Sequence, residues 1–156
     1  MELRSYTEAD AEATLTVFLR AIRETACADY TLEQIDTWAA EHGDINAWAS
    51  SRAAADTQVA VIDGHVAGFT DLDEDGYVDM LFVNPDFGRQ GVATTLLAAT
   101  IALARQRGIS ALTTHASLTA RPLFERLGFV VTEERHLVDG DVEFTNYAMR
   151  RVLGPA

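Results

Sequence analysis

The residues whose types and spacing best suit chemistry form a short loop, Phe87–Thr94, between an apolar strand and a long helical pattern. The free N–H groups and the positive dipole end at the start of a helix attract anions, phosphate groups in particular. Gly91 and Ala93 leave that turn free of bulk, so that a phosphate can approach the backbone. Arg89 adds a mobile positive charge, and Thr94 adds a hydroxyl group. The loop therefore predicts a phosphate site, and an ordinary strand-to-helix connection is the alternative.

Two other kinds of phosphate-binding loop do not fit this segment. The dinucleotide pattern GxGxxG needs two more glycines than are present. The Walker pattern needs a lysine, and the 12 basic residues of this chain are all arginines. The absence of lysine also excludes Schiff-base chemistry.

The strand before the loop, expected at 77–83, brings a carboxylate to the same region. Tyr77, Asp79 and Leu81 alternate onto one side of this strand. Asp79 and Tyr77 are therefore candidate groups for proton transfer on that side. The Asp79 carboxylate could equally bind an ammonium group, face solvent or pair with an arginine.

A second acidic pattern, Asp71-x-Asp73-x-Asp75-Gly76, copies the first half of a calcium-binding EF-hand loop. Its twelfth position is Phe82 instead of glutamate, and the flanking segments read as strands instead of helices. We interpret the pattern as an acidic hairpin turn, and we expect no metal site in the chain.

The composition is that of a globular chain with a strong negative charge. Its 156 residues fit one domain spanning 1–156, with 48% hydrophobic and 23% charged residues. The net charge of -12 disfavours nucleic acid and anionic membranes; it either favours small cationic partners such as amines or only aids solubility. Neither a membrane span nor a signal peptide is recognisable, so a cytoplasmic location is expected. Cys27 is the only cysteine, which excludes an intramolecular disulfide.

Hydrophobic periodicity divides the chain into strands and helices. Strands are expected at 2–6, 58–62, 65–72, 77–83, 110–115, 129–136 and 142–149. Helices are expected at 7–26, 31–41, 90–107 and 119–127, with a short irregular helix at 44–55. The strand–helix–strand unit between 77 and 115 requires a parallel pair, whereas the hairpins around it are antiparallel. The fold class is therefore α+β, with a mixed sheet and helices packed on its faces.

The loop resembles the acyl-CoA loop of the GNAT superfamily of N-acetyltransferases. That motif is Gln/Arg-x-x-Gly-x-Gly/Ala followed by paired leucines, and this chain has Gly88-Arg89-Gln90-Gly91-Val92-Ala93 and then Leu96-Leu97. The first position departs from the family pattern, because a glycine stands there. The next residue, Arg89, could supply the missing charge.

Further motifs resemble the same family in the same order. The Leu-x-Val-x-Pro run of its fourth strand is matched by Leu81-Phe82-Val83-Asn84-Pro85. Its fourth helix carries Asn-x-x-Ala, then Tyr, then Gly-Phe, where this chain has Ser117-x-x-Ala120, Phe124 and Gly128-Phe129. The segment from Asp29 to Ala39 is similar to a poorly characterised bacterial branch of the superfamily.

The resemblance implies a mixed, centrally splayed sheet of about seven strands with helices on both faces, and acetyl-CoA in the gap. The pantetheine arm would pair with the main chain of Leu81 and Val83, and the Leu81 N–H would serve as the oxyanion donor. Ser117 and Phe124 would border the cofactor. The pyrophosphate would take N–H groups from Arg89, Gln90, Gly91, Val92, Ala93 and Thr94.

The resemblance also implies direct transfer of an acetyl group to a primary amine. Asp79 and Tyr77 would then be candidates to accept the proton that the amine loses, directly or through a water. The family tyrosine that protonates the leaving thiolate is replaced here by Phe124, which has no proton to give. His115, Ser117 and Tyr147 are candidate substitutes. A thiolate whose conjugate acid has a pKa of about 8.5 to 9 can also leave unassisted.

The expected function is that of an acetyl-CoA-dependent N-acetyltransferase that acts on a small-molecule amine. A cationic acceptor is favoured, and a peptide acceptor stays an open alternative. An N-acyltransferase that uses a longer acyl-CoA is one alternative. A non-catalytic domain that binds acyl-CoA as a sensor is another, and the missing tyrosine is its main support. Family members are often dimers, so a homodimer also stays open.

Overall fold

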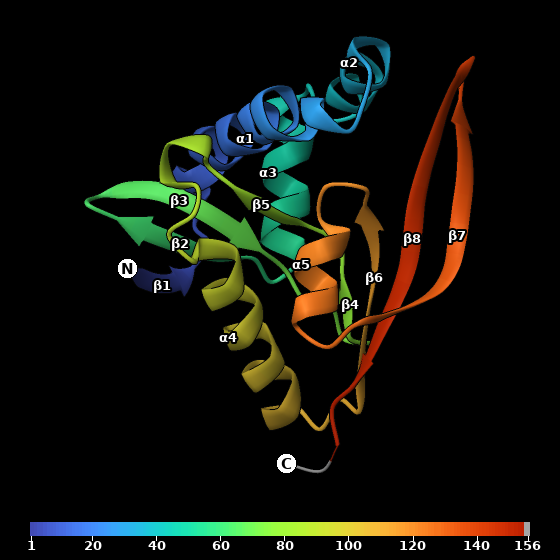
Figure 1. Cartoon of the computed structure of the whole chain (residues 1–156). Coiled ribbons are helices and arrows are strands. Elements are labelled where there is room, and N and C mark those ends of the chain that lie inside the picture. The colour runs from blue at the N-terminus through green and yellow to red at the C-terminus, as the bar shows by residue number, and fades with distance from the viewer. Residues whose placement is uncertain (155–156) are drawn as a thin grey trace.

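The computed structural model describes residues 1–154 and contains two four-stranded sheets side by side (Figure 1). The first sheet has strand order β1-β2-β3-β5 and the second β4-β6-β8-β7. The strands are β1 (Glu2–Ser5), β2 (Gln58–Ile62), β3 (His65–Thr70), β4 (Tyr77–Val78), β5 (Leu81–Val83), β6 (Ala111–Ser117), β7 (Val130–Asp139) and β8 (Val142–Val152). The α-helices are α1 (Ala11–Arg20), α2 (Leu32–Ala40), α3 (Ile45–Ala54), α4 (Val92–Gln106) and α5 (Arg121–Arg126).

The sheets confirm the predicted α+β class and the predicted mixture of strand directions. Every pair in the first sheet is antiparallel, whereas β4 and β6 run parallel, with Tyr77 opposite Thr113. Helix α4 lies between these two strands in the sequence, as the strand–helix–strand unit requires. The described chain has eight strands instead of about seven, because one predicted strand is divided in two.

The prediction of one continuous strand at 77–83 is wrong. Asp79 and Met80 separate β4 from β5 and belong to no strand. Their N–H groups both donate to Oδ1 of Asp71, at 2.8 and 3.2 Å. A side-chain carboxylate therefore takes the place of a main-chain acceptor at the point where the chain passes from one sheet to the other.

Beyond this break β5 and β6 part from each other, which confirms the predicted central splay. Val78 and Thr114 are the last residues paired between β4 and β6, and β6 continues to Ser117 paired with β8. Among the described strands, β5 pairs with β3 alone. One edge of β5 is therefore open.

The acidic motif that begins at Asp71 is an exposed turn only in its later part. Asp71 itself is 2% exposed, and its Oδ2 accepts a hydrogen bond from Nη1 of Arg52 in α3 at 3.1 Å. Arg52 is 3% exposed. Asp73, by contrast, accepts the N–H groups of Asp75 and Tyr77 and forms the turn. The first carboxylate of the motif therefore belongs to the core.

Helices α1 and α4 cover opposite faces of the first sheet (Figure 1). On the α1 face large side chains such as Phe69 are buried. On the α4 face the fully buried residues of the sheet are small, namely Ala60, Ala67 and Gly68. A Cβ atom on Gly68 would lie 2.8 Å from Cγ1 of Val92, so glycine is needed for the start of α4 to approach the sheet this closely.

The N-terminal helical segment, predicted as one helix at 7–26, is α-helical only in α1. A 3-10 turn (Glu8–Asp10) precedes α1, and a π-helical turn (Ala21–Thr25) and a second 3-10 turn (Ala26–Ala28) follow it. The helix expected to be irregular at 44–55 is a regular helix, α3. No helix within residues 1–154 is long and apolar enough to cross a membrane.

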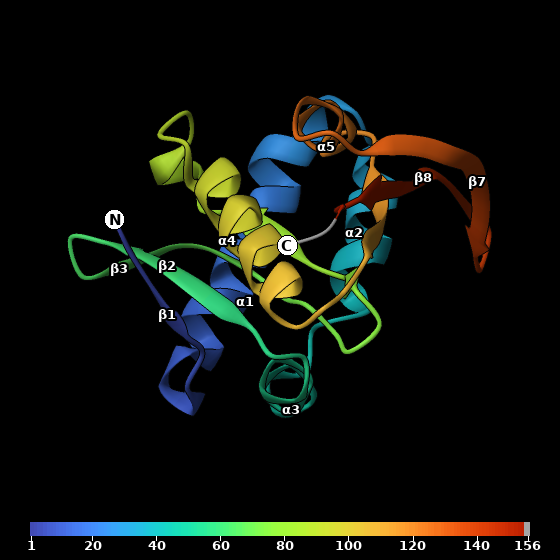
Figure 2. The ribbon, with the colours of Figure 1, turned by 90° about the horizontal axis from the view of Figure 1, so that it is seen from below.

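The β7–β8 hairpin is longer than predicted and lies at the opposite end of the molecule from β1 (Figures 1 and 2). Two contacts tie it to the region of α2. The side-chain amide of Gln34 donates to the Glu143 carbonyl at 2.7 Å, and the Tyr30 hydroxyl donates to the Thr145 carbonyl at 3.3 Å. Gln34 also completes the predicted capping box with Thr31. The hairpin is thereby held beside the gap between the sheets.

Candidate active site

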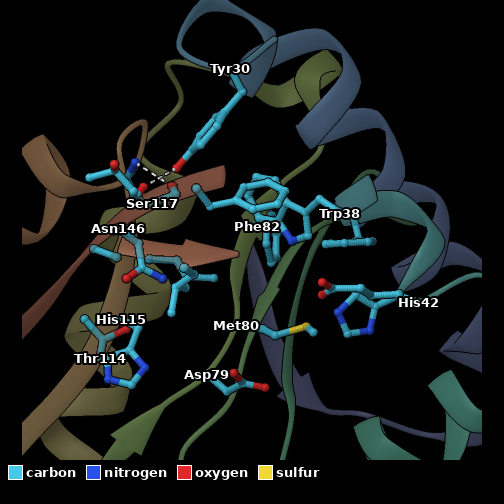
Figure 3. Close-up of a pocket in the computed structure, with 18 of the residues that line it drawn as sticks. Tyr30, Trp38, His42, Asp79, Met80, Phe82, Thr114, His115, Ser117 and Asn146 are labelled. Atoms are coloured by element: carbon cyan, nitrogen blue, oxygen red, sulfur yellow. Dashed lines mark hydrogen bonds between the residues drawn. The ribbon is translucent and has the colours of Figure 1, made fainter. Parts of the chain in front are cut away.

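A cavity of about 520 Å³ lies where β5 and β6 diverge (Figure 3). Residues of β4, β5 and β6 line one side, and residues of α1, of the α2 region and of the β7–β8 hairpin line the others. The phenylalanine, tyrosine and tryptophan side chains of the lining are Phe18, Tyr30, Trp38, Tyr77, Phe82, Phe124 and Phe144. The splay of the sheets therefore opens a partly apolar cavity of the size that small ligands occupy.

The three predicted residues of the strand expected at 77–83, namely Tyr77, Asp79 and Leu81, all line this cavity. Alternation along one continuous strand does not explain why these residues line the same cavity. The break between β4 and β5 also brings Met80 and Phe82 into the lining, which a continuous strand would have turned to its other face.

Asp79 lies between two histidines, His115 from β6 and His42 just after α2 (Figure 3). Nδ1 of His115 is 3.1 Å from the hydroxyl of Tyr77. Burial lowers the pKa of both imidazoles, and the Asp79 carboxylate opposes the shift in each. Burial raises the pKa of Tyr77 to about 12. At neutral pH, neutral imidazoles and a protonated phenol therefore surround the carboxylate.

The open edge of β5 presents main-chain groups toward the gap. The Asn84 N–H donates to the Ala67 carbonyl at 2.8 Å, so this residue faces β3. Alternate residues of an antiparallel strand bond to the same neighbour, so Phe82 faces β3 as well. The N–H groups of Leu81 and Val83 therefore point away from β3, toward the space between β5 and β6. The Val83 side chain packs under α4.

Ser117 and Phe124 both line the cavity. The Ser117 Oγ accepts the N–H of Ala120 at 3.1 Å, and its own proton stays free to donate. Phe124 is 2% exposed and packs edge-to-face on Phe129, with ring centroids 5.0 Å apart. Phe124 thus offers the cavity an apolar surface and no proton.

Tyr147, one of the candidate proton donors, does not reach the cavity. Its hydroxyl donates to Glu134 at 3.3 Å, and the Arg121 guanidinium lies 4.3 Å from its ring centroid. Its neighbour in β8, Asn146, lines the cavity, so alternation turns Tyr147 to the other face of the sheet. The sequence did not show which residues of this strand face the cavity and which face the other side of the sheet.

The predicted phosphate loop follows β5 through a 3-10 turn, Pro85–Phe87, and ends at α4. Within the described chain, none of the six N–H groups from Arg89 to Thr94 donates a hydrogen bond to another residue. Gly91 caps α4 with a φ of 76°, a left-handed conformation that side-chain-bearing residues rarely adopt. Arg89 has a φ of 62° and is exposed, as are Gln90 and Thr94.

Two further carboxylates, Glu41 and Asp139, line the cavity from the α2 region and from the end of β7. Burial, a hydrogen bond to Asp139 and the charge of Asp139 raise the pKa of Glu41 to about 6. No arginine of residues 1–154 is part of the lining. In the same range, no three histidine, cysteine or acidic side chains are grouped so that they could hold a metal ion.

The sequence interpretation missed Glu41, His42, Asp139 and Asn146 as cavity residues. Local sequence patterns identify their segments only as the end of a helix and as a hairpin. The capping box at the start of α2 and the length of the hairpin are visible in the sequence, but the contact that brings them together is a tertiary one.

Comparisons with known proteins agree with this architecture. A family model described as an acetyltransferase (GNAT) domain matches residues 26–151. The uncharacterized N-acetyltransferase YafP of Escherichia coli K12 is 36% identical over 150 residues, which cover 96% of this chain and 95% of YafP.

Solved structures agree as well. A GCN5-related N-acetyltransferase from Rhodopseudomonas palustris superposes with a TM-score of 0.93 at 32% identity, over 97% of this chain and 95% of that one. The putative acetyltransferase YncA of Salmonella typhimurium, solved with acetyl-CoA, has a TM-score of 0.72 at 21% identity, over 100% and 95%. PaiA of Thermoplasma acidophilum, solved with coenzyme A, has a TM-score of 0.79 at 18% identity, over 97% and 98%. The chain belongs to the GNAT superfamily and is a GNAT-type N-acetyltransferase.

Proposed function

We propose that the protein binds acetyl-CoA along the open edge of β5 and transfers its acetyl group directly to an amine in the cavity. The observation that carries the proposal is that two sets of unpaired N–H groups follow one another in the chain. The first is on β5 at Leu81 and Val83, and the second runs from Arg89 to Thr94. Pantetheine amides suit the first set, and a pyrophosphate suits the second. The complexes of YncA with acetyl-CoA and of PaiA with coenzyme A support this choice of cosubstrate.

In the proposed reaction the amine nitrogen attacks the thioester carbonyl carbon, and the C–S bond breaks as the C–N bond forms. The Leu81 N–H donates to the carbonyl oxygen, on which negative charge develops. Asp79 accepts the proton that the amine loses, directly or through a water. Phe124 gives the departing thiolate no proton, so the thiolate leaves unassisted or takes a proton from Ser117 or His115. The Tyr77 hydroxyl contacts Nδ1 of His115, and Tyr77 takes part in the reaction through that imidazole.

We further propose that the acceptor is a small primary amine that carries a second positive charge. Asp79 would face the reacting amine, and Glu41 and Asp139 would face the other charge. The three carboxylates line one cavity with aromatic walls and no arginine of the described residues, a combination that favours cations.

Replacing Gly91 by glutamate should abolish CoA binding, because a carboxylate would stand where the pyrophosphate is proposed to lie. We expect calorimetry to give a Kd for CoA that is about 100-fold weaker or worse. Gly91→Asn is the matched control, since asparagine tolerates the left-handed conformation and carries no charge. CoA affinity that survives Gly91→Glu would contradict the loop assignment.

Replacing Asp79 by asparagine should lower kcat/KM on the order of 100-fold at low pH and much less at high pH. The reason is that an amine already deprotonated in solution needs no base on the enzyme. The measurement is a pH–rate profile of both proteins with one acceptor. A variant whose profile has the wild-type shape would remove Asp79 from the role of base.

Thiol release from acetyl-CoA should be faster with short diamines than with monoamines of the same length, with about a tenfold higher kcat/KM. The preference should weaken as pH falls through about 6, since Glu41 then takes up a proton and loses its charge. Glu41→Gln should likewise reduce the preference for diamines over monoamines. Equal rates with both amines would refute the acceptor class. Bound acetyl-CoA with no release for any amine would instead support a binding role.

A further inference from the structure

We propose that Asp71 and Arg52 are a positioning pair for this reaction, which holds the Leu81 N–H and the Asp79 carboxylate in working geometry. The inference rests on the proposed function, because the two groups that it positions are the proposed oxyanion donor and base. Neither Asp71 nor Arg52 lines the cavity. The pair would therefore act through the main chain between β4 and β5.

Asp71 makes three hydrogen bonds that together fix this part of the chain. Oδ1 accepts the N–H groups of Asp79 and Met80 at 2.8 and 3.2 Å, and Oδ2 accepts Nη1 of Arg52 at 3.1 Å. The bond to the Asp79 N–H thus fixes the backbone of the residue whose own carboxylate enters the cavity. A single side chain therefore constrains both the base and the residue before Leu81.

A neighbouring side chain fixes the other polar group of Met80. The hydroxyl of Thr70, which is fully buried, donates to the Met80 carbonyl at 2.7 Å. Met80 thus bonds through its N–H and its carbonyl to the side chains at the end of β3. The next peptide N–H, that of Leu81, must then face the opposite way, into the gap. Its direction follows from these bonds.

Burial raises the pKa of Asp71 to about 6, and the Met80 and Asp79 N–H groups, with the charge of Arg52, oppose this rise. The Arg52 guanidinium is buried, lies 4.9 Å from the ring centroid of Trp48, and has no carboxylate within ion-pair distance among residues 1–154 other than that of Asp71. A protonated or amidated residue at position 71 would bring a donor against the Arg52 guanidinium. The side chain would then rotate, and the two N–H groups would lose their acceptor.

A second ion pair, in which the carboxylate is buried and the Arg4 side chain is 37% exposed, provides the control. Asp10 is 5% exposed, accepts two hydrogen bonds from Arg4 at 2.7 and 2.8 Å, and also accepts the Thr7 N–H at 2.8 Å. The pair belongs to the N-terminal segment and does not line the cavity. Asp10→Asn should therefore cost stability without disturbing β5.

The test compares Asp71→Asn, the double variant Arg52→Met/Asp71→Asn and Asp10→Asn with the wild type. For each protein we would measure Tm, the Kd for CoA, kcat, and the infrared carbonyl stretch of bound [1-13C]acetyl-CoA. Asp71→Asn should lower kcat about 10- to 100-fold with an unchanged Kd for CoA. Its bound carbonyl stretch should move from the lowered wild-type frequency toward that of free acetyl-CoA. The double variant should regain much of kcat, because its amide no longer faces a buried cation.

A merely structural role predicts a different pattern, in which Asp71→Asn lowers Tm as Asp10→Asn does, and both keep the wild-type kcat and carbonyl frequency. That pattern would overturn the inference. If the wild type binds acetyl-CoA but turns over no amine, the carbonyl stretch alone decides the inference. If the wild type binds no acetyl-CoA, the proposed function falls, and the inference falls with it.

Discussion

The carboxylate of Asp71 takes the place of a main-chain ladder at the centre of this fold. Removing a charge from water costs several kcal/mol, and the cost is offset only where the charge is paired and fully hydrogen-bonded. Asp71 has Arg52 on one oxygen and two backbone N–H groups on the other. Deleting one partner of such a pair costs about 3 to 5 kcal/mol, because the other charge stays buried. The break between β4 and β5 depends on this arrangement.

The geometry of the site follows from the break. Because the chain leaves one sheet at Val78 and joins the other at Leu81, no strand among residues 1–154 pairs with the second half of β6 on that side, and β5 keeps an open edge. That edge runs on through a short turn into the start of α4, which Gly68 allows to lie close to the sheet. Unpaired N–H groups thus line one path from the cavity to the helix terminus. The cavity itself is closed by the α2 region and the hairpin, which Tyr30 and Gln34 hold together.

Those parts of the site that are contiguous in the sequence could be predicted from it. The loop up to Thr94 and the main chain of Leu81 lie within one run of residues, so local patterns and the family resemblance were enough to propose them as site residues. The walls could not be found in this way, since Glu41 and Asp139 are far apart in sequence and meet only in the folded chain. Asp71 was interpreted only as part of an acidic hairpin turn, because acidic spacing carries no information about burial.

The order of the elements could likewise be predicted, but not the exact geometry of strands. Alternation placed Tyr77, Asp79 and Leu81 on one side of a continuous strand, whereas a break brings them together. Tyr147 was counted among the proton donors, and the register of β8 turns it away from the cavity toward Arg121. Register depends on pairing with distant strands, and one residue of shift exchanges the two faces.

The central claim is that an open strand edge receives the cosubstrate, and a crystal structure of the protein with acetyl-CoA tests it most directly. The account predicts that the thioester carbonyl oxygen lies about 3 Å from the Leu81 nitrogen, with the pantetheine amides paired to β5. It also predicts that the pyrophosphate contacts the N–H groups between Arg89 and Thr94. A thioester bound elsewhere, with the β5 edge left unpaired, would contradict the account.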